Sequence, residues 1–68
     1  MRTIEGYVEH IIFQNAQNGY MVFKLVGEDE EITCTGCVKG LSEGENIEAQ
    51  GEDTEHPLYG PQFEVRSY

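Results

Sequence analysis

The stretch Thr3-Ile-Glu-Gly-Tyr-Val-Glu-His-Ile-Ile-Phe13 decides the fold. Its core-forming residues fall into two sets of opposite parity, first Ile4, Gly6 and Val8, and then Ile11 and Phe13. Because side chains alternate between the two faces of a strand, a strand of fixed parity cannot bury both sets. A β-bulge near Glu9 and His10 would bring both sets inside, and bulges are how strands bend around small barrels.

The rest of the chain also has the pattern of short strands separated by turns. Asn18-Gly19 is a strong hairpin signal, and the segment 20–26 that follows is apolar on both parities. Further strands are expected at 31–38, 45–51 and 62–68. The last two alternate cleanly, which predicts an inward-facing set of Ile47, Ala49, Gly51, Phe63 and Val65. Residues 53–61 contain two prolines and a glycine, so we expect a long loop there.

The number of strands and the length of the chain predict a closed barrel. No segment shows a sustained helical period, and five strands in 68 residues must close their sheet to bury both a core and the strand edges. We therefore expect one all-β domain over residues 1–68, a five-stranded Greek-key OB-fold barrel. The connection between the third and fourth strands is short, so it should carry little or no helix. An SH3-like barrel is the competing fold.

Charge and composition exclude several classes of protein. The chain has 4 Lys and Arg against 13 Asp and Glu, a net charge of −9, which opposes binding to nucleic acid or to acidic membranes. It contains no apolar run near the roughly 20 residues that a membrane span needs. The start of the chain lacks an apolar signal core, so we expect a cytoplasmic location and no membrane contact.

The sequence lacks the residues of a catalytic or cofactor site. A phosphate-binding loop needs Gly-x-x-x-x-Gly-Lys followed by a hydroxyl residue, and here the dipeptide is reversed, as Lys39-Gly40. We therefore expect no catalytic residue and no cofactor in this chain. Cys34 and Cys37 lie three apart in an expected strand, so their thiols should diverge and form no metal site. His56 precedes a proline and is expected to order its loop through a hydrogen bond.

Two stretches resemble a known family. Phe13-Gln-Asn-Ala-Gln-Asn-Gly-Tyr20 and His56-Pro-Leu-Tyr-Gly-Pro-Gln-Phe63 lie in longer segments that together cover nearly the whole chain. They resemble the N-terminal OB-fold domain of RecD-like ATP-dependent DNA helicases. These are superfamily 1 enzymes of 5′ to 3′ polarity, often labelled exodeoxyribonuclease V alpha subunit. Asp53 departs from the pattern, since the family usually carries a large apolar or aromatic residue there.

The resemblance implies that this chain is an N-terminal fragment of a longer helicase that acts in DNA recombination and repair. The remainder of that helicase would be its partner, and ATP and Mg²⁺ would be bound by the parent enzyme beyond Tyr68. The fragment would then be a non-catalytic module that contacts single-stranded DNA weakly at most. Two alternatives stay open: an autonomous single-stranded nucleic-acid-binding OB protein, and a structural adaptor unrelated to DNA.

Aromatic residues mark the places where an OB-fold binds single strands. OB-folds stack bases on aromatic side chains of the second and third strands and on the loops between strands one and two and strands four and five. Tyr20, Phe23 and Tyr59 lie in those places, with Lys24 close by, so these four are the candidates for a weak nucleic-acid contact. The competing interpretation is that the rings fill the core of the barrel.

Overall fold

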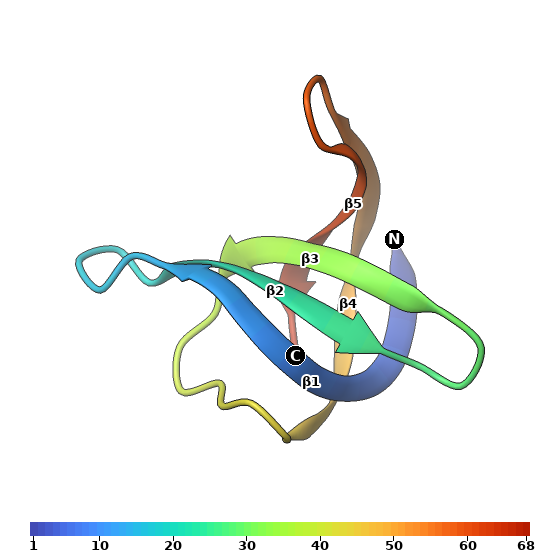
Figure 1. Ribbon diagram of the computed structural model, residues 1–68, viewed down its shortest axis with the longest axis horizontal. Helices are drawn as coiled ribbons and strands as arrows, with labels where there is room; N and C mark the ends of the chain where they lie inside the picture. Colours follow the sequence, from blue (N-terminus) through green and yellow to red (C-terminus); the bar gives the residue numbers. More distant parts are fainter.

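The computed structural model describes residues 1–68 as five strands without a helix. The strands are β1 (Arg2–Gln14), β2 (Tyr20–Val26), β3 (Glu31–Cys37), β4 (Asn46–His56) and β5 (Gly60–Ser67). They form a closed barrel in the order β1-β2-β3-β5-β4, in which β1 curves around to pair with both β2 and β4 (Figure 1). No helix of the structure has the length and hydrophobicity to cross a membrane.

The pairing pattern confirms the expected Greek-key OB-fold. Every neighbouring pair is antiparallel except β3 with β5, which run parallel and pair only at Cys34 with Phe63 and at Thr35 with Glu64. The connection from β3 to β4 contains no helix, as expected from its length. It is nevertheless anchored, because Val38 and Leu41 are buried in the core.

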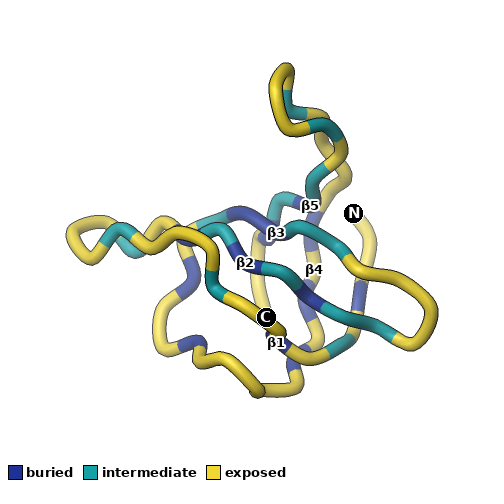
Figure 2. The backbone as a smooth tube through the Cα atoms, in the orientation of Figure 1, coloured by how far each residue is buried: buried dark blue, intermediate teal, exposed yellow.

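The core lies inside the barrel and follows the alternation seen in the sequence. Figure 2 shows buried segments on the barrel walls and exposed residues at the turns. On β4 and β5 the inward-facing set was correctly predicted, since Ile47, Ala49, Gly51, Phe63 and Val65 are all buried. The largest fully buried side chains are Phe23 and Phe63, which lie in this interior.

Two irregularities bend β1, where the sequence predicts one. The register against β2 shifts between Val8 and His10, as expected, and shifts again between Ile11 and Phe13. The second shift makes the predicted burial of Phe13 wrong. Ile11 packs against the core, but Phe13 turns to the outer face opposite Val22 and remains 51% exposed.

The β3–β4 connector reaches the bulged segment of β1. Glu43 accepts a hydrogen bond from the Ile11 amide at 2.8 Å, and its carboxylate lies 3.1 Å from Nδ1 of His10. These contacts lower the pKa of Glu43, chiefly through the Ile11 hydrogen bond and then through His10. A carboxylate distant in sequence thus satisfies a backbone amide on the bulged segment of β1.

The long loop expected at 53–61 is instead a hairpin. β4 continues to His56 and β5 begins at Gly60, so only three residues form the turn. Proline removes a backbone donor but is tolerated at a strand edge, and Pro61 pairs with Glu55 at the start of β5. In Figure 1 this hairpin projects away from the barrel, and residues 53–62 are called the β4–β5 arm below.

Gly51 permits the close approach of β4 and β5. A Cβ atom at this position would overlap the carbonyl oxygen of Glu64 and crowd the Phe63 ring. Gly51 also lies where the β4–β5 register shifts, next to Gln50. The absent side chain therefore lets two strands close the barrel.

Candidate functional site

A groove of about 510 Å³ lies between the β1–β2 hairpin and the β4–β5 arm. Its lining contains three aromatic rings and a histidine, and no residue that is acidic or carries a permanent positive charge. We call it the aromatic groove, lined by Ile12, Phe13, Tyr20, Val22, Thr33, His56, Tyr59 and Gln62. This position corresponds to the strand face and loops that OB-folds use for binding.

The first wall of the aromatic groove is set by the β1–β2 turn. Asn15 and Asn18 accept hydrogen bonds from the amides of Gln17 and Tyr20, both at 2.9 Å, and Gly19 adopts a φ of 78°. This turn chemistry suits asparagine and glycine. It places Tyr20, which is 38% exposed, with its ring centroid 6.4 Å from that of Phe13.

The second wall is held by His56. Its Nδ1 accepts hydrogen bonds from the amides of Leu58 at 3.1 Å and Tyr59 at 3.3 Å, which confirms the expected role of this histidine in ordering the turn. The ring of His56 also lies 4.7 Å from the ring of Tyr59. The Tyr59 ring therefore has His56 as an aromatic neighbour, although 75% of Tyr59 is exposed.

The structure separates the four candidate residues. Tyr20 and Tyr59 both line the aromatic groove. Phe23 is 0% exposed inside the barrel, so it presents no face on which a base could stack, and the core interpretation holds for this ring. Lys24 lies outside the groove lining, and its Nζ is 3.2 Å from a carboxylate oxygen of Glu31.

Phe13 and His56 are groove residues that the sequence did not identify as such. Phe13 was expected inside because one bulge was counted where two occur. His56 was assigned only a role in ordering its loop, which it also performs. The neighbouring apolar residues Ile11, Ile12 and Phe13 were the available signal, since three in a row cannot all face inward on one strand.

The remaining cations also lie outside the lining of the aromatic groove. Arg2 donates a hydrogen bond to Asp53 at 2.6 Å, and this contact raises the pKa of Arg2. Arg66 lies 2.8 Å from Glu64 and 3.4 Å from Glu52. Lys39, the fourth cation, sits in the β3–β4 connector and does not line the groove.

A comparison with known protein families identifies the family of this domain. A family model described as the OB-fold domain of the ATP-dependent DNA helicase YrrC matches residues 1–68. The chain belongs to this family. Searches of curated proteins and of solved structures gave no match.

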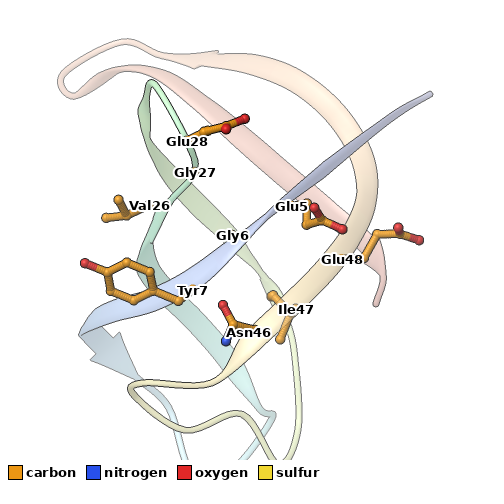
Figure 3. Close-up of a pocket in the computed structure, with 9 residues that line it drawn as sticks. All are labelled: Glu5, Gly6, Tyr7, Val26, Gly27, Glu28, Asn46, Ile47 and Glu48. Atoms are coloured by element: carbon orange, nitrogen blue, oxygen red, sulfur yellow. The ribbon is translucent and has the colours of Figure 1, made fainter.

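A larger depression of the YrrC-type OB-fold domain, about 700 Å³, lies where β1 passes between the end of β2 and the start of β4. Figure 3 shows Glu28 apart from Glu5 and Glu48, which lie next to each other because they are partners in the β1–β4 pairing. Converging polar groups are what distinguish a binding pocket from a surface hollow. The chain brings no three His, Cys, Asp or Glu side chains together as metal ligands.

The two cysteines of this helicase domain diverge, as predicted. Cys34 is fully buried and Cys37 is exposed, so their side chains lie on opposite sides of the barrel wall. Burial raises the pKa of the Cys34 thiol to about 12. A thiol with this pKa stays protonated and behaves as a small apolar core residue.

Proposed function

We propose that this domain is the non-catalytic N-terminal module of a RecD-like DNA helicase. The parent would be a superfamily 1 enzyme of 5′ to 3′ polarity, of the kind labelled exodeoxyribonuclease V alpha subunit, acting in the cytoplasm in DNA recombination and repair. In this role the domain packs against the rest of the enzyme or a partner protein and contacts single-stranded DNA weakly at most. ATP and Mg²⁺ belong to the parent's motor.

The parent assignment is supported by the family match and by the two motif stretches. The stretch from Phe13 to Tyr20 contributes one wall of the aromatic groove, and the stretch from His56 to Phe63 contributes the other. The residues that carry the resemblance therefore meet at one surface. A Gly-x-x-x-x-Gly-Lys-Thr segment encoded downstream in the same reading frame is the expected sign of the motor.

The positions of the positive charges are the observation that supports weak binding to single-stranded DNA. Affinity for single strands depends on cations that displace counterions from phosphates. Three of the four cations are paired with carboxylates and none lines the groove, while the net charge is −9. Stacking on the exposed rings alone would have to overcome this repulsion.

A second candidate function, an autonomous single-strand binder, is favoured by the exposed rings of Phe13, Tyr20 and Tyr59 at the binding face. Fluorescence anisotropy with a labelled poly-dT oligonucleotide separates the two functions. For the 68-residue chain we expect a Kd weaker than about 10⁻⁵ M at moderate salt. A sub-micromolar Kd that weakens steeply with added salt would overturn the proposed function in favour of the second one.

A further inference from the structure

We propose that the aromatic groove is a docking site for an extended polypeptide segment that carries apolar side chains and flanking lysine or arginine. This inference rests on the proposed function, and it specifies the chemistry of the partner surface that the domain contacts. It assigns the groove to protein rather than to nucleic acid.

Exposed apolar surface is concentrated at this groove. Four of the eight large hydrophobic residues that are exposed in the structure line it, and a fifth, Leu58, lies at the adjoining tip of the β4–β5 arm. The four are Ile12, Phe13, Tyr20 and Tyr59. Single exposed apolar residues are common on soluble domains, whereas a cluster of them at one groove is a feature of interaction surfaces.

Hydrogen bonds at both walls of the aromatic groove position two of its aromatic residues. The Tyr20 amide donates a hydrogen bond to Asn18 in the turn. The Tyr59 amide donates one to Nδ1 of His56, and the two rings lie 4.7 Å apart. Aromatic side chains with few rotatable bonds, held in place by their neighbours, lose little entropy on binding. Aromatic side chains positioned in this way are typical of the anchor residues of binding interfaces.

The shape of the groove floor fits an extended chain. β3 and β5 pair only where Cys34 meets Phe63 and where Thr35 meets Glu64. Beyond these pairs the two strands diverge, as Figure 1 shows. Thr33 and Gln62, the first residues past the point of divergence, both line the groove. A gap between separating strands, with aromatic walls, resembles the surfaces that bind extended and proline-containing segments.

Charge determines which extended partner is favoured. The groove lacks Lys and Arg, and the domain around it has a net charge of −9. This field repels a phosphate backbone, and it also repels a second copy of the same chain. A segment with lysine or arginine is attracted, and its apolar side chains can cover the exposed rings.

The test uses the 68-residue chain and three fluorescein-labelled peptides of equal length. Each peptide has a central run of alternating proline and leucine, flanked by arginine, serine or glutamate. We expect saturable binding that is strongest for the arginine peptide and weakest for the glutamate peptide, with amide shifts in nuclear magnetic resonance spectra confined to the groove. Phe13→Ala and Tyr59→Ala should each weaken binding of the arginine peptide by about tenfold.

Tyr7→Ala is the matched control, because Tyr7 is an exposed aromatic residue outside the aromatic groove. This variant should bind the arginine peptide as the unsubstituted chain does. Equal binding of all three peptides, no binding of any, or an equal loss in Tyr7→Ala would overturn the docking site while leaving the proposed function intact. Tight binding of poly-dT that is lost in Tyr59→Ala would overturn both.

Discussion

Strands β4 and β5 are buried at one end and exposed at the other. In the barrel, Ala49 and Phe63 are fully buried, and the two strands pack against the other three. In the β4–β5 arm the same ladder continues from Asp53 to Gln62 with nothing packed on either face as a core. Backbone pairing therefore extends both strands, but the burial of side chains determines which part of them contributes to the free energy of unfolding. Substitutions in the two regions should therefore separate stability from binding.

The largest effect is expected from Phe63→Ala at the barrel end of β5. Phe63 is one of the two largest fully buried side chains, and its removal leaves a cavity in a small core. We expect the free energy of unfolding to fall by about 3–5 kcal/mol, measured by urea denaturation. A loss below about 1 kcal/mol would mean that β5 contributes no core, and the contrast between barrel and arm would fail.

The next effect is expected from Gly51→Ala, where β4 lies too close to β5 to leave room for a Cβ atom. The added methyl group overlaps a backbone oxygen that cannot move without disturbing the ladder. We expect a loss of at least about 2 kcal/mol in the free energy of unfolding.

Gly44→Ala provides the matched comparison for Gly51→Ala. Gly44 has a φ of 88°, but a Cβ atom there meets nothing within 4 Å. The cost should then be only the backbone strain of the left-handed region, about 1 kcal/mol. Equal losses in the two variants would show that barrel closure places no special demand on Gly51.

A smaller, pH-dependent effect is expected from Glu43→Gln. The pKa of Glu43 is lowered in the folded chain, so the ionised carboxylate stabilises the fold above its unfolded pKa of about 4.3. That stabilisation is lost as the pH falls through the lower folded pKa. The difference in melting temperature between the native chain and Glu43→Gln should thus shrink as the pH falls through the acid range.

Glu28→Gln is the control for this titration, since Glu28 accepts no hydrogen bond and forms no ion pair in the structure. Its melting temperature should follow that of the native chain through the same acid range. If the Glu43→Gln difference persisted in acid, the contact between the connector and the bulge would not depend on the carboxylate charge.

The barrel was predictable from the sequence because its rules are local. Alternation on β4 and β5 identified Phe63 and Ala49 as core residues, and Asn18-Gly19 identified the first hairpin. These features depend on the side-chain period of a strand and on turn chemistry, which a single segment contains in full.

The groove was predictable only in part, because its shape depends on distant contacts. Tyr20 and Tyr59 were identified from their places in the fold, but Phe13 was assigned to the core. Its orientation follows from a second bulge whose adjoining amide, on Ile11, is satisfied by Glu43, 32 residues away. Likewise, the polar and proline-containing composition of segment 53–61 predicts a loop. In the structure, pairing between β4 and β5 makes this segment part of a hairpin. Neither the contact of Glu43 with Ile11 nor this pairing can be recognised from neighbouring residues in the sequence.

The smallest effect on stability is expected from Tyr59→Ala at the exposed end of the same hairpin. Tyr59 contacts His56 but buries little surface, so the free energy of unfolding should change by no more than about 0.5 kcal/mol. The same variant is expected to bind the arginine peptide about tenfold more weakly, whereas Phe63→Ala loses stability. A loss above about 2 kcal/mol in urea denaturation would show that the arm and the barrel share one cooperative core, and the aromatic rings would then be explained by folding without a partner.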